Sequence, residues 1–236
     1  DYLLDDHKIS FGYNFKRLDI YNEFVQNSLG IWVFRSMADF ELGNAYSFRY
    51  NNSPTLNTKD AAVSFVRDEH ALYVHDEWAA AESLLIDFGV RYERLASDDS
   101  PVSNPDFIAA TGYNNTENLD GLDIFLPRLG FKWDATEDLV VRGGVGRFSG
   151  GSPSVWSGNA YGKNGLTQVD TQTIFSNTAR FGSLLRGMDI TQIPQQILDF
   201  VQNSDVTSEV NLNDPNFKLP SDWRFQIATD YNVDIP

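Results

Sequence analysis

The feature that most constrains this chain is a regular alternation of apolar and polar residues in segments of about ten residues. A period of two puts successive side chains on opposite faces of a β-strand. The segment at 71–78 is the least regular, because Asp76 falls on the same face as Trp78. The six segments are residues 7–16, 71–78, 83–95, 125–134, 139–148 and 222–231. The sequence therefore predicts an all-β, antiparallel fold.

Two kinds of all-β protein are compatible with such strands. In a soluble sandwich or propeller, the apolar face is the core and the polar face meets water. In a transmembrane β-barrel, the apolar face meets lipid and the polar face lines the lumen. Segment length favours the barrel, because a tilted strand needs about ten residues to cross a bilayer, whereas globular strands average nearer five or six. We predict a transmembrane barrel and keep the soluble fold as the alternative.

The connections between the predicted strands fall into two length classes. Residues 79–83 and 134–138 are short enough to be hairpin turns. The long connections are residues 22–62, 96–123 and 150–219. Outer-membrane barrels have short periplasmic turns and long outer loops. We therefore expect three long extracellular loops, the last with a short helix that Thr191 caps and in which Pro194 lies early.

The barrel interpretation assigns each strand residue to a side. An Arg or Lys facing lipid at mid-bilayer would cost roughly 2–4 kcal/mol, so the charged residues should face the lumen. Aromatic residues near strand ends, Phe148 among them, should form girdles at the interfaces. The lipid-facing or girdle candidates are Trp78, Tyr92, Trp133, Trp223 and Tyr231. The lumen-facing candidates are Asp87, Arg91, Glu93, Arg128, Lys132, Asp134, Arg142, Gly144, Gly146, Arg224 and Asp230.

Three glycines interrupt the segment at 139–148. Gly144 and Gly146 fall on the same face as Arg142, and Gly143 falls on the opposite face. Bare backbone weakens a strand unless another body must approach it closely. We therefore expect the two inner glycines to make room for a body inside the barrel.

Six or seven strands are too few to close a barrel. The smallest single-chain barrels have eight strands, and an open sheet in lipid leaves backbone groups without hydrogen bonds. We therefore expect residues 1–236 to form an internal part of one larger barrel domain.

Composition and motif spacing exclude several functions. The net charge of −15 and the lack of a basic cluster argue against nucleic-acid binding. His70 and His75 have a spacing that suits no metal site. Loop carboxylates and amides are ligands that Ca²⁺ accepts, but turn formation explains them better. These loop residues are Asp120, Asp123, Asn213, Asp214 and Asn216. With no cysteine, no nucleophile elbow and no phosphate-binding loop, we predict no enzyme, metal or cofactor.

Two hairpins resemble those of TonB-dependent outer-membrane receptors. The first, at 73–95, has Tyr-x-x-Asp-x-Trp followed by Leu-x-x-x-x-Gly-x-Arg-Tyr. The second, at 125–148, has Pro-Arg-x-Gly followed by Arg-x-Gly-x-Gly-x-Phe. With "IWVFRSMADF" and "NAYGKNGL", the chain is most similar to the Oar-type subgroup, whose members carry a carboxypeptidase-regulatory-like module. The resemblance spans roughly residues 6–156 and 220–236, and the long connection between them matches nothing.

The resemblance implies a 22-stranded barrel in the outer membrane of a Gram-negative bacterium. An N-terminal plug, which is not among these residues, is expected to fill it. It also implies uptake of a scarce ligand, such as a siderophore, peptide or oligosaccharide. The implied partners are outer-membrane lipid, the protein's own N-terminal plug, the TonB complex that acts through this plug, and an extracellular ligand. Two alternatives stay open. One is a secreted or surface sandwich or propeller that acts as an adhesin or carbohydrate binder. The other is a passive porin without a plug.

Overall fold

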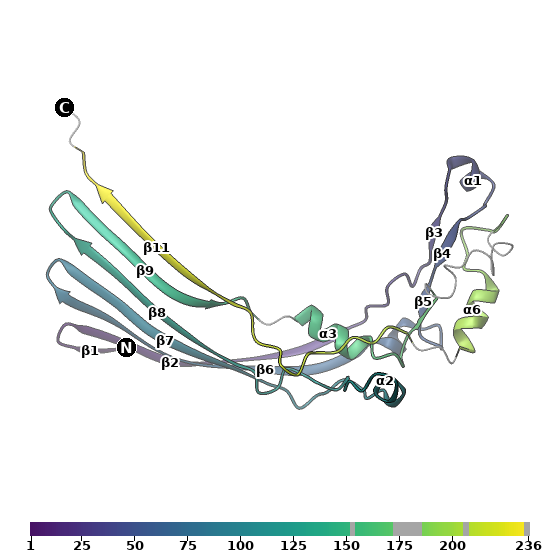
Figure 1. Ribbon diagram of the computed structural model, residues 1–236, viewed down its shortest axis with the longest axis horizontal. Coiled ribbons are helices and arrows are strands. Elements are labelled where there is room, and N and C mark those ends of the chain that lie inside the picture. Colours follow the sequence, from purple (N-terminus) through teal and green to yellow (C-terminus); the bar gives the residue numbers. More distant parts are fainter. Residues whose placement is uncertain (152–153, 172–185, 205–207, 234–236) are drawn as a thin grey trace.

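The main element of the protein is one antiparallel sheet of seven strands (Figure 1). The computed structural model describes residues 1–151, 154–171, 186–204 and 208–233. The strands follow one another as an up-and-down meander in the order β1-β2-β6-β7-β8-β9-β11. They are β1 (Tyr2–Leu4), β2 (His7–Asn22), β6 (Val63–Ala81), β7 (Leu84–Ala96), β8 (Asp123–Asp134), β9 (Leu139–Ser149) and β11 (Ser221–Tyr231). The predicted all-β, antiparallel fold is confirmed.

The two ends of the sheet differ in their connections. At one end, three short turns join β1 to β2, β6 to β7 and β8 to β9 (Figure 1, left), and we call it the short-turn end. At the other end lie the long connections that the sequence predicted (Figure 1, right), and we call it the long-loop end. The turn Glu82–Ser83 is shorter than predicted, because β6 continues to Ala81 with an irregular register between Ala79 and Ala81.

Two strands extend further than the alternation indicated. β6 has 19 residues and β2 has 16, and their extra length lies mainly at the long-loop end. At that end the alternation of apolar and polar residues is lost, because residues of the long connections cover the strands. Phe65, for example, is buried beneath a loop residue. The short strand β1 has three residues and was not predicted.

The pairing register carries the alternation across the whole sheet. In one row, Phe11 lies opposite Val74, Val74 opposite Val90, and Val90 opposite Pro127. In a nearby row on the other face, Asn14 lies opposite Ala71 and Ala71 opposite Glu93. We call these two sides the apolar face and the polar face. Each face is continuous over six strands because no neighbouring pair slips by one residue within this region.

No second layer covers the apolar face within the described residues. Phe225 is 85% exposed, Ile227 72% and Phe11 67%. A sandwich or propeller would bury these side chains as its core. Over the described residues, the sheet therefore lacks the buried core that the soluble-fold alternative predicted. The outer strands β1 and β11 each have one neighbour in this sheet, so the sheet is open.

The long connections contain short elements of their own. No helix in the described ranges is long and apolar enough to cross a membrane. The elements are β3 (Ile31–Val33), α1 (Met37–Glu41), β4 (Ser47–Arg49), β5 (Asn51–Asn52), the 3-10 helix η1 (Thr58–Ala61), α2 (Pro105–Thr111), α3 (Ser154–Gly162), β10 (Val169–Asp170) and α6 (Gln195–Gln202).

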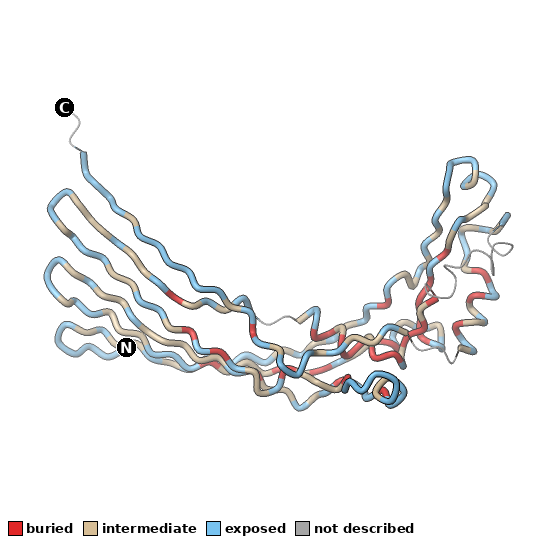
Figure 2. Tube along the Cα trace, in the orientation of Figure 1, coloured by how far each residue is buried: buried red, intermediate tan, exposed pale blue. Residues whose placement is uncertain are grey.

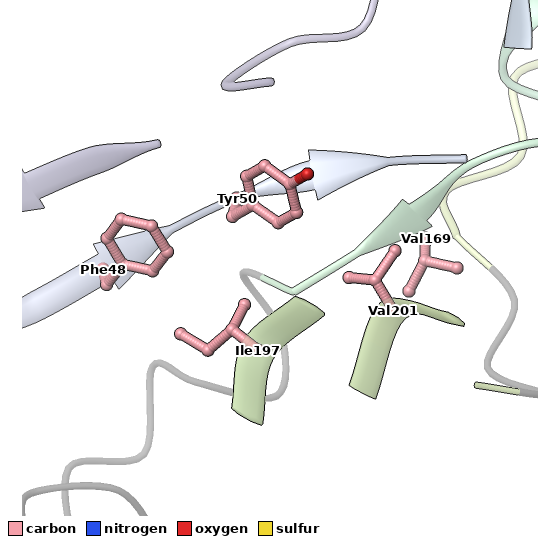
Figure 3. Packing of buried hydrophobic residues seen from close by; sticks show 5 residues of the cluster. All are labelled: Phe48, Tyr50, Val169, Ile197 and Val201. Carbon is pink, nitrogen blue, oxygen red and sulfur yellow. The ribbon is translucent and has the colours of Figure 1, made fainter. Parts of the chain in front are cut away.

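The first and third long connections fold together into a lobe. β5 pairs with β10, and α6 packs against both with its apolar side (Figure 3). Ile197 and Val201 on α6 are 1% and 0% exposed. We call β3, β4, β5, β10 and α6 the loop lobe. Its core consists of Phe48, Tyr50, Val169, Ile197 and Val201. The loops therefore have a hydrophobic core separate from the sheet, and buried residues concentrate at this end (Figure 2).

The helix predicted in the third connection is present, but its start was predicted wrongly. α6 begins at Gln195 with Pro194 as its N-cap residue, and no side chain caps it. Thr191 instead forms a turn in which its hydroxyl donates to Asp189. Proline cannot donate a backbone hydrogen bond, so its place at the helix boundary costs little.

Helix α3 lies against the polar face at the long-loop end. The Tyr161 ring stacks on Phe65 of β6 with centroids 4.0 Å apart. Arg67, two residues further along the same face, donates to the Ser154 hydroxyl at 3.0 Å. The Tyr161 hydroxyl donates to the carbonyl of Asp99 at 2.7 Å. These contacts join the second and third connections over the polar face.

We predict that Asn104→Ala destabilises α2 by about 1–3 kcal/mol, because it removes an N-cap and leaves a buried carbonyl unpaired. Asn104 is 1% exposed. Its side chain accepts from the Phe107 amide at 3.0 Å and donates to the Asn164 carbonyl at 2.9 Å. Amide exchange in α2 of the full-length protein measures the effect. The control is Asn114→Ala at a nearby exposed position, and equal exchange in both variants would contradict the prediction.

Candidate functional site on the polar face of the sheet

The polar face collects the charged residues that the sequence singled out. The eleven lumen-facing candidates all lie there: Asp87, Arg91, Glu93, Arg128, Lys132, Asp134, Arg142, Gly144, Gly146, Arg224 and Asp230. The five girdle candidates all lie on the apolar face: Trp78, Tyr92, Trp133, Trp223 and Tyr231. That the polar face lines the lumen and the apolar face meets lipid stays a prediction.

Most charged side chains on the polar face pair with one another. Several pairs join residues two apart on one strand, and others cross to the neighbouring strand. The pairs are Lys8–Glu77 (3.0 Å), Lys16–Glu69 (3.4 Å), Arg67–Glu69 (3.2 Å), Arg91–Glu93 (2.6 Å), Lys132–Asp134 (3.0 Å), Arg142–Asp230 (3.1 Å) and Arg224–Asp222 (2.6 Å), and Asp87 lies 2.7 Å from His75, which is charged only when protonated. Each solvent-exposed pair stabilises the fold by at most about 1 kcal/mol. Their main effect is to leave the face almost neutral.

Arg128 departs from this pattern. It lies in β8 with Gly89 beside it on β7 and Gly146 beside it on β9. Neither neighbour has a side chain that could pair with it. Across the described ranges, the Arg128 guanidinium makes no hydrogen bond or ion pair, and it is exposed. It is therefore available to a group outside the sheet.

Glycines lie on both sides of Arg128, and the Phe148 ring covers one of them, Gly146. Gly89, Gly130, Gly144 and Gly146 lie on the polar face of three adjacent strands, and we call them the glycine floor. Two recesses of about 460 Å³ and 340 Å³ lie beside this floor. Arg128 and Phe148 line both recesses. The floor can therefore receive another body at close range.

The glycines of the floor differ in what a side chain would meet. A Cβ at Gly144 would lie 3.0 Å from the Leu129 carbonyl oxygen, and one at Gly89 2.7 Å from that of Val74. These two glycines are therefore required by strand pairing itself. A Cβ at Gly130 would meet nothing closer than 3.7 Å. Gly144→Phe would disturb the sheet directly, so Gly130 is the better position for testing whether a body lies on the floor.

The structure corrects the predicted side of Phe148 and adds two residues to the site. Phe148 was grouped with the interfacial aromatics, but its register opposite Asp222 places it on the polar face. There the Arg224 guanidinium carbon lies 5.5 Å from its ring centroid. Tyr73 and His75 also line the larger recess and were not predicted. Continuing the alternation through 71–78 would have placed both on the polar face.

Two charged pairs interrupt the apolar face: Arg17–Asp68 at the long-loop end and His7–Asp76 near the short-turn end. Asp76 lies opposite Ile9 and Phe88, and its carboxylate is 2.7 Å from His7 Nδ1. The His7 ring stacks on Trp78 with centroids 5.5 Å apart. The His7 contact satisfies one carboxylate oxygen, Oδ2, while the other, Oδ1, is buried with no hydrogen-bond partner among the described residues.

No group of three metal-binding side chains occurs among the described residues. His70 and His75 point to opposite faces of β6. Three of the loop residues considered for Ca²⁺ form hydrogen bonds within the protein. Asp214 accepts from the Asn216 amide in a turn, whereas Asp120 accepts from the Ser97 amide and Asn213 donates to the Glu117 carbonyl. Turn formation thus accounts for Asp214, and the other two join separate loop segments.

The pKa values of several loop side chains are shifted by their hydrogen bonds or by burial. A hydrogen bond from Lys163 holds the pKa of Glu209 below its usual value. Hydrogen bonds from Thr58 and Tyr21 lower the pKa of Glu23. Because both carboxylates have lowered pKa values, the stabilisation they provide is present at neutral pH and is lost as the pH falls through those values. Burial raises the pKa of Tyr161. None of these shifts lies at the glycine floor.

Comparison with known proteins agrees with the architecture. The family model described as "Outer membrane beta barrel domain" matches residues 2–234, almost the whole chain. No curated protein and no solved structure shows a significant match.

Proposed function

Because the chain belongs to the family of outer-membrane β-barrel domains, we propose that it is part of a TonB-dependent receptor for a scarce ligand. The protein lies in the outer membrane of a Gram-negative bacterium. On this proposal the long-loop end is extracellular and the short-turn end is periplasmic. The apolar face contacts lipid, and the polar face lines the lumen.

The observation that carries the proposal is that glycines of the two hairpin motifs lie together on the polar face. Gly89 belongs to the first hairpin motif, and Gly130, Gly144 and Gly146 belong to the second. Together they form the glycine floor, with Arg128 at its centre. Strand pairing accounts for Gly89 and Gly144 in any barrel, whereas at Gly130 a Cβ would meet nothing closer than 3.7 Å. Bare backbone at Gly130 suits a lumen filled by protein better than a water-filled pore. The motif residues thus favour a filled barrel over a passive porin.

The remaining elements of the proposal follow from the resemblance. The full barrel would have 22 strands and hold an N-terminal plug through which the TonB complex acts. The ligand would be a siderophore, a peptide or an oligosaccharide, bound from outside near the loop lobe. We propose a transport role rather than a catalytic one.

We predict that the full-length protein is closed in planar bilayers. A plugged receptor should show no steady conductance in its folded state, and it should open only when urea unfolds the plug. A pull-down with the purified periplasmic domain of TonB provides the second arm, and we expect it to retain the full-length protein.

A steady, urea-independent conductance together with no retention on TonB would contradict the proposal and would indicate a passive porin. As a control, the same preparation should show the heat-modifiable gel mobility of a folded barrel, so that a closed bilayer is not the result of failed insertion.

A further inference from the structure

We propose that the wall formed by β8 and β9 opens laterally at the long-loop end and admits the acyl chain of a membrane lipid, and that Arg147 holds this opening closed. The opening lies between residues 123–127 of β8 and 147–149 of β9, and we call it the seam. The inference goes beyond the proposed function. It requires lipid on the apolar face, but neither a plug nor TonB.

Pro127 ends the pairing of β8 with β9. Alternate residues of a strand direct their backbone groups to the same neighbour. The Ala135 amide donates to the carbonyl of Leu139, where β9 begins, so the odd-numbered residues of β8 face β9. Pro127 therefore faces β9 as well, but it has no N–H to donate. The register of the two strands accordingly stops at Arg128 opposite Gly146.

The break is confined to this one pair of strands. On its other side, β8 stays paired with β7 as far as Asp123. In the same way, β9 stays paired with β11 as far as Ser149. The two strands therefore continue to the long-loop end without a ladder between them. Separating them at this point breaks fewer backbone hydrogen bonds than separating two strands with a continuous ladder.

One side chain bridges the seam. The Arg147 guanidinium donates to the Phe125 carbonyl of β8 at 3.4 Å and to the Ser221 hydroxyl of β11 at 3.0 Å. Phe125 is odd-numbered, so its carbonyl faces β9, and the guanidinium takes the place of a backbone donor. This role explains an arginine on the apolar face, where it lies opposite Trp223. Because both acceptors are neutral oxygens, the contact is weaker than a bidentate bond to a carboxylate.

The residues that border the seam are apolar on both faces of the sheet. On the apolar face they are Phe125 and Trp223, which are both more than half exposed. On the polar face they are Leu126 and Leu219, which are buried in one cluster. The recess of about 460 Å³, which Leu126 and Phe148 line, lies on the polar side of the seam. A hydrocarbon chain suits these surroundings, whereas a polar solute would lose hydration there.

The test uses the full-length protein in lipid vesicles and two substitutions with opposite effects. Arg147→Leu removes the bridging donor and keeps a side chain suited to lipid. It should accelerate amide exchange at Leu129 and Val145, the nearest facing pair of the ladder, roughly tenfold, the effect of losing a hydrogen bond from a charged group. Pro127→Val restores the missing N–H in a strand-forming residue and should slow the same amides. The control is Val141→Leu, on the same face of β9 within the paired part, and it should leave the exchange unchanged.

A second measurement detects the acyl chain itself. A bimane fluorophore is attached to Phe148→Cys, since these 236 residues contain no cysteine, and the lipids carry a nitroxide on their acyl chains that quenches on contact. Arg147→Leu should increase the quenching, and Pro127→Val should reduce it. The control position is Gly130→Cys, on the same face where β8 and β9 are paired, and its fluorophore should stay unquenched in every variant.

Each outcome decides for or against the seam. Exchange that neither substitution changes would overturn the role of Arg147. Faster exchange without increased quenching at position 148 would show that the strand ends separate without admitting lipid, and it would overturn the lateral opening. Equal quenching at positions 130 and 148 would also overturn it. Steady conductance without retention on TonB would overturn the proposed function and leave the seam standing. If Arg147→Leu does not assemble, as judged by heat-modifiable mobility, the effect of Pro127→Val on exchange and quenching decides.

Discussion

Phe225→Arg should lower the stability of the assembled barrel by about 2–4 kcal/mol, whereas Gln226→Arg should change it by no more than about 0.5 kcal/mol. The two positions are adjacent near the middle of β11, but they lie on opposite faces of the sheet. Phe225 is 85% exposed. An arginine there would be placed in the lipid interior, while an arginine at 226 would lie on the polar face, opposite Gly144 and between Arg224 and Ala228.

Urea unfolding in lipid vesicles, followed by tryptophan fluorescence, measures both variants. In a protein whose apolar face met water, Phe225→Arg would be neutral, because a charge at an exposed site replaces an apolar side chain without desolvation. A neutral result at 225, or equal losses at 225 and 226, would therefore contradict the lipid-facing assignment.

Ile197→Ala should destabilise the loop lobe by about 2–5 kcal/mol while leaving the sheet assembled. Ile197 is 1% exposed and packs in the core that holds the first and third long connections together. Its removal leaves a cavity between α6 and the paired strands β5 and β10. Because this core is separate from the sheet, the loss should be local.

Amide exchange at Ser47–Asn52 reports on the lobe, and heat-modifiable mobility reports on the barrel. The control is Leu29→Ala, an apolar loop residue that is 92% exposed and should change exchange little. Protection at Ser47–Asn52 unchanged by Ile197→Ala would show that the lobe does not depend on this core. Loss of barrel assembly would show that the lobe and the sheet are not independent.

Much of the sheet could be predicted from the sequence because the two faces meet different surroundings. Phe131 and Trp133 alternate with Lys132 and Asp134, and the structure keeps this alternation through six strands. The prediction failed where the contrast between faces disappears. The start of β6 is covered by α3, so Phe65 and Arg67 both become buried and no period survives.

The candidate site could be predicted in part. The side of each glycine follows from strand period, so Gly144 and Gly146 were placed with Arg142. The register between strands was not available from the sequence. Only the pairing shows that Gly89 and Gly146 flank Arg128, that Gly144 closely approaches the Leu129 carbonyl, and that Phe148 belongs to the polar face. The loop lobe depends on contacts between residues more than a hundred positions apart, which local patterns do not encode.

The most direct test of the central account is a nitroxide scan along β11 of the full-length protein in lipid vesicles. Single cysteines replace Trp223, Arg224, Phe225, Gln226 and Ile227 in turn, and each label is tested for collision with oxygen, which concentrates in lipid. The account predicts a period of two, with high oxygen accessibility at 223, 225 and 227 and low accessibility at 224 and 226. Uniform accessibility along the strand, or the opposite alternation, would contradict it.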